Sequence, residues 1–270
     1  RVRSSAASDV YKRQVINIIT DDARNTVNVS SYTHYSGEGR LTESVNADVN
    51  AGKFSSYTSY QRRQAGSWQN NNIDENGYET GRPTSVGFYS NTVNQRFVFN
   101  ATDKLSFYAR GTYYDNKTRR PQDATYYAKS KGQFVQKDAY TYNLKHETYT
   151  YGTGMKYMIN RSAYIDAEFY SDNYSSDYMY FKKSGSYLPG DRVTRKQVRY
   201  YNGNIKGIFR LGSHNKLSAG VEYVNEGLES ESDNIDSRHM YTLAFYAQDE
   251  IKLPLNLQAV LGIRLSLIHI

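Results

Sequence analysis

The sequence predicts an all-β protein: a transmembrane, antiparallel, up-and-down β-barrel. Apolar and polar residues alternate between Val15 and Leu265 in about eleven stretches of strand length, and a period of two places each set on one face of a strand. The connections between these stretches are alternately short and long. That is the pattern of a barrel with tight turns on one side of a membrane and large loops on the other.

Four stretches show the alternation most clearly. Polar or charged residues and glycines stand between their apolar positions, which gives each stretch one apolar face. The apolar sets are Leu105, Phe107, Ala109 and Tyr113; Ala163, Ile165, Ala167 and Phe169; Leu217, Ala219, Val221 and Tyr223; and Leu257, Ala259, Leu261, Ile263 and Leu265. A membrane strand needs about 9–11 residues, and no run approaches the roughly 20 apolar residues of a spanning helix. A soluble sheet with one buried face would alternate in the same way, but the charged opposite faces and the alternating connection lengths favour the barrel.

The connections divide by length and composition. The short ones are rich in Gly, Asn, Asp and Ser, which supply the dihedral angles of tight turns. They lie at 51–53, 102–104, 160–161, 212–215 and around Pro254. The long connections lie at 62–92, 116–145, 183–195 and 229–238, and a shorter member of that series lies at 36–39. We expect the first barrel strand at about 25–35.

Tyrosine dominates the aromatic composition, with 28 Tyr against 10 Phe and one Trp. A tyrosine ring can be buried at a membrane boundary while its hydroxyl stays in water. Tyr149, Tyr151 and Tyr157 share a face with Met155 and Ile159, and we expect some of them in the aromatic girdles of the barrel.

Composition also excludes several classes of protein. The chain has no cysteine, which excludes disulfide scaffolds, thiol catalysis and cysteine-based zinc sites. The formal net charge is +7, but no basic stripe argues for nucleic acid.

The two ends differ in pattern from the rest of the chain. Residues 1–14 share no periodicity with the strand-like stretches after them and lack the apolar centre of a signal peptide. Residues 266–270 come after a strand pattern that reads well through Leu265. Both segments look like translated sequencing-adaptor read-through, so we expect them to be non-native.

Two motifs carry a resemblance to a known family. Val15-Ile16-Asn17-Ile18-Ile19-Thr20 resembles the last plug strand of TonB-dependent outer membrane receptors, although the family's following Lys is Asp21 here. The stretch 243–252, with Ala247-Gln248-Asp249-Glu250, and the stretch 257–265, with Gly262 and Arg264, resemble that family's mid-barrel hairpin. The resemblance covers essentially all of 15–265.

The resemblance implies an N-terminal plug inside a barrel of about 22 strands. Residues 15–22 would then end the plug, and 23–265 would form the N-terminal half of the barrel. Because the plug lies on the periplasmic side of the first strand, the short turns would face the periplasm and the long loops the outside, in agreement with their lengths.

The family imports scarce nutrients such as ferric siderophores or cobalamin across the Gram-negative outer membrane. The partners implied are TonB with its inner-membrane motor, the nutrient ligand, and the lipid or lipopolysaccharide of the outer membrane. A passive porin-like channel and a secreted, Tyr-rich β-sheet adhesin are the alternatives. A porin has no reason to carry the motif Val15–Thr20, and an adhesin would need no detergent.

The sequence offers two groups of candidate site residues. Inward-facing charges would meet the plug or lumen water, and loop aromatics would contact ligand or pack loop against loop. The inward set is Arg96, Arg110, Lys156, Asp166, Glu168 and Glu222; the loop set is Trp68, Tyr78, Phe88, Tyr89, Tyr126, Tyr127, Phe134 and Tyr187. A basic loop would suit an anionic ligand or lipopolysaccharide phosphates equally; its cations are Arg119, Arg120, Lys129, Lys131 and Lys137.

Other chemistry finds little support. Asp166 and Glu168 stand two apart on one strand face, as lumen-wall residues do, and we predict no catalytic residue and no enzyme. Asn72, Asp74 and Asn76 match the start of a calcium loop whose last position would be Pro83, so solvation is the simpler interpretation. The histidines are scattered, and no cofactor motif is present, so we predict no metal site and no cofactor.

Overall fold

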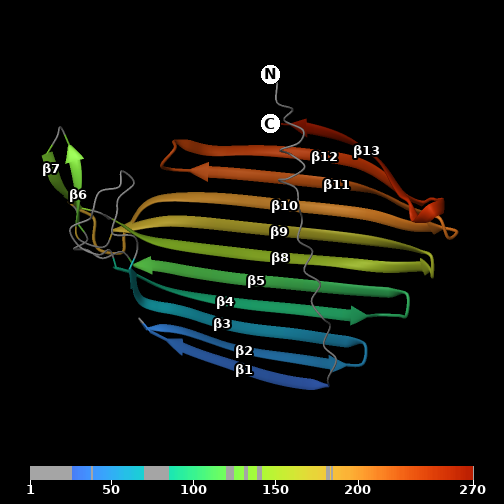
Figure 1. Cartoon of the computed structure of the whole chain (residues 1–270), viewed down its shortest axis with the longest axis horizontal. Coiled ribbons are helices and arrows are strands. Elements are labelled where there is room, and N and C mark those ends of the chain that lie inside the picture. The colour runs from blue at the N-terminus through green and yellow to red at the C-terminus, as the bar shows by residue number, and fades with distance from the viewer. Residues whose placement is uncertain are drawn as a thin grey trace.

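Eleven strands form one antiparallel sheet in this computed structural model, which describes residues 26–37, 39–69, 85–119, 125–130, 133–138, 142–180, 183 and 185–269. The strand order is β1-β2-β3-β4-β5-β8-β9-β10-β11-β12-β13, so neighbours in the sheet follow one another along the chain (Figure 1). β1 and β13 lie at the two edges. The predicted up-and-down topology is confirmed.

The strands are long compared with a membrane crossing. They are β1 (Val27–Ser36), β2 (Arg40–Ala51), β3 (Phe54–Gln69), β4 (Ser85–Asn100), β5 (Leu105–Arg119), β8 (Tyr142–Asn160), β9 (Ala163–Tyr180), β10 (Arg192–Leu211), β11 (Asn215–Ser230), β12 (Ile235–Lys252) and β13 (Gln258–His269). Most exceed the roughly 9–11 residues that a strand needs to span a bilayer.

The short connections lie where the sequence predicts them, and one predicted long loop is short. β11 ends at Ser230 and β12 begins at Ile235, so the predicted loop 229–238 is a four-residue turn. Ser230 Oγ donates a hydrogen bond to Asp233 Oδ2 at 2.7 Å, and Asn234 adopts a φ of 53°, as a tight turn requires. Polar composition suggested a loop because these residues lie at the wet end of the strands.

The connection 116–145 contains an element that the sequence analysis missed. β6 (Thr125–Ser130) and β7 (Gln133–Asp138) pair with each other as a separate two-stranded sheet. Their alternation is weak because neither strand joins the main sheet. The η1 turn (Pro254–Asn256) connects β12 to β13.

The register gives the main sheet one apolar face. One continuous row of Cα partners on that face runs Phe54, Phe99, Phe107, Met155, Ala167, Ile205, Val221, Phe245 and Leu265. Large apolar side chains on this face are exposed, up to 74% for Ile263 on β13. Among the described residues, only Ala65, Ala163 and Ala244 are buried apolar residues. A soluble sheet would bury such a face, so the apolar face requires an apolar solvent.

Tyrosines bound this apolar belt on the side of the long loops. Tyr60, Val93, Tyr113 and Tyr149 form one cross-strand row. The next row on the same face is polar: its members are Glu43, Arg62, Asn91, Asp115, Glu147, Ser175, Gln197 and Glu229. Of the three tyrosines named for the girdles, Tyr149 lies in this row, Tyr151 lies opposite Gly111, and Tyr157 lies opposite Leu105 near the short turns. Their role in a girdle stays a prediction.

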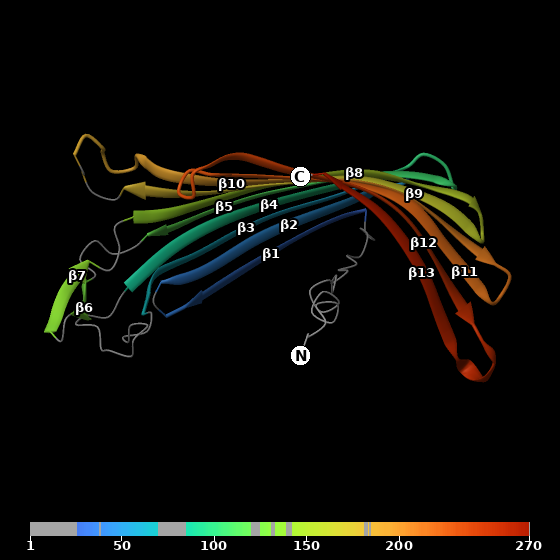
Figure 2. The ribbon, with the colours of Figure 1, turned by 90° about the horizontal axis from the view of Figure 1, so that it is seen from above.

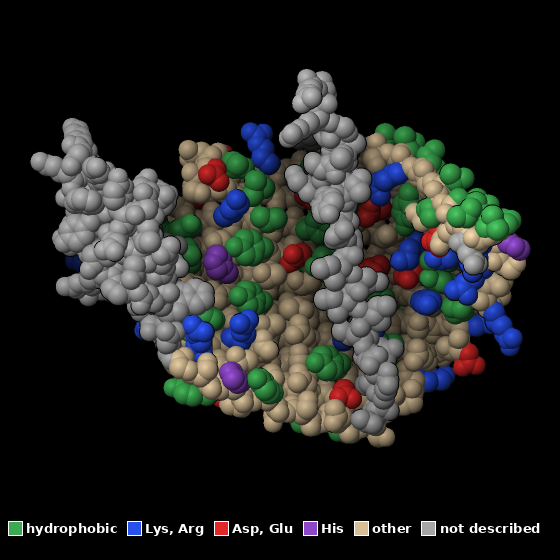
Figure 3. All heavy atoms as spheres, in the orientation of Figure 1, with side chains coloured by type: hydrophobic (Ala, Val, Ile, Leu, Met, Phe, Trp, Pro, Cys, Tyr) green, Lys and Arg blue, Asp and Glu red, His purple; other side chains and the backbone are tan. Residues whose placement is uncertain are grey.

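The sheet is curved like a trough (Figure 2). Its concave side carries Lys, Arg, Asp and Glu side chains spread over several strands (Figure 3). Among the described residues, no helix has the length and apolarity to cross a membrane.

The ends of the chain bear on several predictions. The predicted plug strand 15–22 and the segment 1–14 lie outside the described residues. β13 extends past Leu265 to His269, with Leu267 opposite Leu243 and His269 opposite Tyr241. The ladder therefore continues through 266–269, and the non-native origin of this tail stays a prediction.

Candidate functional site

The predicted inward-facing charges share the polar face, and several of them pair with one another. Arg110 Nη2 donates to Glu168 Oε1 at 2.9 Å across β5, β8 and β9. The same guanidinium lies 5.5 Å from the ring centre of Tyr170. Gly152 of β8 stands between the partners, and a Cβ there would lie 3.0 Å from Arg110 Nε. The glycine therefore gives the arginine room to cross the intervening strand.

A second group lies farther along the sheet. Glu222 accepts hydrogen bonds from Arg264 Nη2 at 2.7 Å and from Asn202 Nδ2 at 3.0 Å. Lys206 Nζ lies 3.9 Å from Asp166 Oδ2. These ion pairs and hydrogen bonds connect side chains of β9, β10, β11 and β13 on the inward face. Such charge-assisted contacts are typical of a surface that faces water.

The remaining predicted charges line a hollow near the short turns. Its volume is about 410 Å³, and Arg96, Lys156, Asp166 and Tyr108 are among its lining residues. Arg96 is the Cα partner of Arg110, and Lys156 Nζ lies 4.4 Å from the ring centre of Tyr164. The six predicted residues thus form one polar surface. Their contact with a plug stays a prediction.

The predicted loop aromatics are more dispersed. Tyr89 lies on the outward face, with the guanidinium of Arg62 and the ammonium of Lys117 at 5.5 and 5.9 Å from its ring centre. Tyr187 stacks on Tyr180 at 5.0 Å, which is a loop-to-strand contact. The backbones of Trp68, Tyr126, Tyr127 and Phe134 belong to β3, β6 and β7, but their side chains lie outside the described residues, as does the whole of Tyr78 and of the suggested calcium loop.

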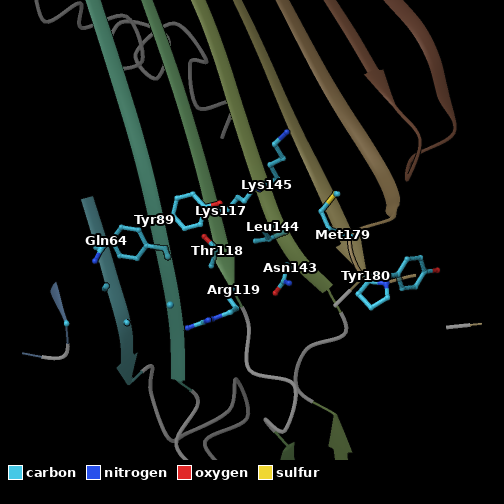
Figure 4. Close-up of a pocket in the computed structure, with 17 residues that line it drawn as sticks. Gln64, Tyr89, Lys117, Thr118, Arg119, Asn143, Leu144, Lys145, Met179 and Tyr180 are labelled. Atoms are coloured by element: carbon cyan, nitrogen blue, oxygen red, sulfur yellow. The ribbon is translucent and has the colours of Figure 1, made fainter. Parts of the chain in front are cut away.

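A larger hollow lies at the end of the sheet that carries the long loops (Figure 4). Its volume is about 710 Å³, and it extends from β3 to β9 and the turn at 189–190. Phe88, Tyr89 and Tyr180 contribute aromatic rings, and Lys117, Arg119 and Lys145 contribute cations. No Asp or Glu is among its described lining residues. The sequence analysis named Phe88, Tyr89 and Arg119 among the residues that line this hollow. The other lining residues could not be found from local sequence, because only the pairing register of the strands brings them together.

Opposite charges also pair on the outward face, beyond the tyrosine row. Asp177, whose side chain is 4% exposed, accepts two hydrogen bonds from Arg195 at 2.7 Å each. These bonds raise the pKa of the Arg195 guanidinium. Sequence reasoning missed this pair, because the two residues are 18 positions apart and nothing in either strand alone relates them. Within the described part of the chain, no group of three or more His, Cys, Asp or Glu is placed to hold a metal ion.

No protein-family model matches the chain, and no curated protein sequence matches it. Several solved structures, in contrast, are similar to the chain. A mutant of the ferric enterobactin receptor from Pseudomonas aeruginosa aligns with a TM-score of 0.69 and 12% identity, over 93% of this chain and 40% of that one. The siderophore receptor PirA from Acinetobacter baumannii aligns with a TM-score of 0.63 and 14% identity, over 93% and 40%.

The copper transporter OprC is similar too, with a TM-score of 0.59 and 9% identity, over 89% of this chain and 35% of that one. At such identities the likeness shows the fold: eleven strands with the arrangement of part of a receptor barrel. The chain spans about 40% of the length of the first two structures.

Proposed function

We propose that the chain belongs to a TonB-dependent outer membrane receptor that imports a scarce nutrient, of the class of ferric siderophores or cobalamin. One observation carries the proposal: an apolar outward face and an ion-paired inward face, on a sheet that shares its fold with the ferric enterobactin receptor over 93% of the chain. The motif Val15–Thr20, which resembles the family's last plug strand, supports it independently.

The proposed barrel is too wide to be filled by its own side chains. A lumen enclosed by about 22 strands would leak unless a folded plug occupied it. The inward wall, with Arg110 paired to Glu168 and Arg264 paired to Glu222, offers hydrogen-bonding groups to such a plug and to the water around it. The external loops would capture the nutrient, and TonB with its inner-membrane motor would supply the energy. The protein would act by transport and not by catalysis.

The test uses the complete reading frame that contains this chain. Sequencing across both ends should find a signal peptide, a TonB-contact segment and a plug upstream, and about eleven further strands downstream. The frame is then expressed in a Gram-negative host that lacks its own siderophore receptors. We expect the protein in the outer membrane fraction and growth on ferric siderophore under iron limitation, or uptake of cobalamin in the matching assay.

A host without TonB provides the control. Uptake that persists there would indicate a passive channel, and the proposed function would be wrong. A protein that stays soluble without detergent would indicate a secreted sheet protein, with the same consequence.

A further inference from the structure

We propose that the turn between β12 and β13, residues 253–257, is inserted in the hydrocarbon of the periplasmic leaflet and anchors this end of the barrel wall in lipid. Its binding partner is the acyl chains of phospholipid. This placement rests on the proposed function, which puts the apolar face of the sheet in the outer membrane and the short turns on the periplasmic side.

The composition of this turn differs from that of the other four short turns at the same end of the described sheet. Those four each carry a cationic or imidazole side chain: Lys53, Lys104, Arg161 and His214. The turn 253–257 reads Leu-Pro-Leu-Asn-Leu and has no ionisable side chain. Its three leucines, Leu253, Leu255 and Leu257, are 44%, 91% and 59% exposed. Hydrophobic side chains gather along β13 and at its turn, at the upper right in Figure 3. Such an exposed apolar group marks a surface that contacts another molecule or a membrane.

The backbone conformation of Leu255 also points to contacts outside the described chain. Its φ of 64° and ψ of 27° lie in the left-handed region, which is unfavourable for a residue with a Cβ and is typical of Gly or Asn. In a turn surrounded by water, Gly or Asn would remove this strain without the loss of any contact. A leucine offsets the strain where its side chain is buried in an apolar solvent.

The hydrogen bonds of the turn suit an apolar solvent. The amide of Leu253 donates to the carbonyl of Leu257 at 2.8 Å, and the amide of Leu257 donates to the carbonyl of Pro254 at 3.4 Å. Pro254 itself has no amide N–H to satisfy. Because an unpaired backbone donor is costly in hydrocarbon, these features lower the free energy of placing the turn in lipid.

The turn lies at the margin of the apolar belt. Counted from the row of Cα partners that begins at Phe54, successive hairpins extend zero, two, four, six and eight residues farther toward the short turns. Their outward-facing residues next to the turns are Phe54, Ala101, Ile159, Leu211 and Leu253. A constant stagger is what the tilted strands of a barrel require, so the five turns end at about one level.

Continuity with the belt favours lipid over a periplasmic protein as the partner. Leu253 and Leu257 follow Ile251 and Ala259, which pair on the outward face. Lys252 and Gln258 pair on the opposite face, so the apolar side of the turn is the side that the belt presents to the membrane. Leu255 extends the belt past the level at which the other turns become polar.

The experiment uses the complete receptor, reconstituted in vesicles of phosphatidylethanolamine and phosphatidylglycerol. The chain has no cysteine, so single-cysteine variants of a receptor freed of any other cysteine each carry one nitroxide spin label. Leu255→Cys is compared with Ile263→Cys on the apolar face and with Asp103→Cys in a polar turn. The measured quantities are the collision rates of each label with O2, which dissolves in hydrocarbon, and with a water-soluble nickel chelate.

We expect the ratio of O2 to nickel collisions at position 255 to approach that at 263. It should exceed the ratio at 103 by about tenfold, because hydrocarbon excludes the polar chelate. A ratio at 255 equal to that at 103 would place the turn in water and overturn the inference. Low collision rates with both reagents would also overturn it, because they indicate cover by a protein.

The variant Leu255→Asn gives a second measurement, whose sign distinguishes water from lipid. Asn tolerates the left-handed region, so in water the variant should melt at the same or a higher temperature. In hydrocarbon it loses apolar burial and adds an amide without partners, and we expect a lower melting temperature in the vesicles. Leu188→Asn, in the connection between β9 and β10, controls for the loss of an exposed leucine and should leave the melting temperature unchanged. An unchanged or higher melting temperature of Leu255→Asn would contradict the inference.

The label at Ile263 separates this inference from the proposed function. A hydrocarbon ratio at 263 without one at 255 would overturn the anchoring turn alone. A water-like ratio at 263 would overturn both the anchoring turn and the membrane barrel. Collision rates need no transport, so a failure of nutrient uptake would contradict the proposed transport and leave the position of the turn measurable.

Discussion

Asp177 on β9 and Arg195 on β10 form a two-pronged ion pair in which both carboxylate oxygens accept hydrogen bonds at 2.7 Å. The Asp177 side chain is almost fully buried, whereas that of Arg195 is one-third exposed, at 33%. The pair joins two strands beyond the tyrosine row, where the outward face is polar. At these ends of β9 and β10, an ion pair therefore stabilises the sheet in place of apolar contacts.

Replacement of Arg195 by Gln should therefore destabilise the barrel. The buried Asp177 would lose two charge-assisted hydrogen bonds, and we expect a cost of about 2–3 kcal/mol in the free energy of unfolding. Thermal unfolding of the complete receptor in detergent measures it. Arg199→Gln is the matched control, because its pair with Glu229 is 3.5 Å long and exposed on both sides, which is worth less than about 1 kcal/mol. Equal losses for the two variants would contradict the role assigned to Asp177.

Gly220 should tolerate no side chain. A Cβ there would lie 2.6 Å from the carbonyl oxygen of Ile205 and 2.5 Å from Tyr246 Oη, so the backbone itself would have to move. We expect Gly220→Ala to cost about 1–3 kcal/mol. Gly203→Ala is the control, since a Cβ at Gly203 meets nothing within 4 Å. The folded fraction on a heat-dependent gel and the melting temperature compare them, and equal behaviour would show that the strands yield at Gly220.

The pair between Arg110 and Glu168 allows a test of the lumen wall. Arg110→Glu would place two carboxylates together, and we expect uptake to fall while the amount of receptor at the surface stays normal. Exchange of both residues, Arg110→Glu with Glu168→Arg, rebuilds the pair in reverse. Recovery of uptake in the exchanged variant would assign the pair to the wall alone, whereas continued loss would indicate that Arg110 also contacts the plug. Unchanged uptake in the single variant would exclude both roles.

His146 should make the stability of the protein depend on pH. It lies on β8 beyond the Tyr149 boundary, 2.9 Å from the hydroxyl of Tyr174. Burial lowers its pKa from 6.5, although the charge of Asp177 acts in the opposite direction. The unfolded chain therefore takes up a proton that folded His146 resists, so its contribution to stability is present at pH 7 and declines as the pH falls below about 6.5.

His146→Gln should reduce this decline in melting temperature between pH 7 and 5. His214→Gln, in the exposed turn after β10, controls for the loss of an imidazole. An unchanged pH profile in the His146 variant would contradict the prediction.

Much of the fold can be predicted from local sequence. Alternation with a period of two depends only on neighbouring residues, so the apolar sets at 105–113, 163–169 and 217–223 identify both the strands and their outward faces. The tight turns are predictable from Gly, Asn, Asp and Ser for the same reason. The hairpin of β6 and β7 and the short turn at 231–234 were not predicted, because polar strands that extend into water resemble loops in composition.

The inward or outward orientation of each charged residue was also determined by the sequence, because strand periodicity fixes the face. The partners of each charge were decided only by the tertiary structure. Arg110 and Glu168 lie 58 positions apart, and Arg264 and Glu222 lie 42 apart, and their meeting depends on the register of several strand pairs at once. A shift of one residue in any of those pairs would move a side chain to the opposite face, so the register of the assembled sheet, and not local pattern, places Lys117 beside Tyr89 and Asp177 against Arg195.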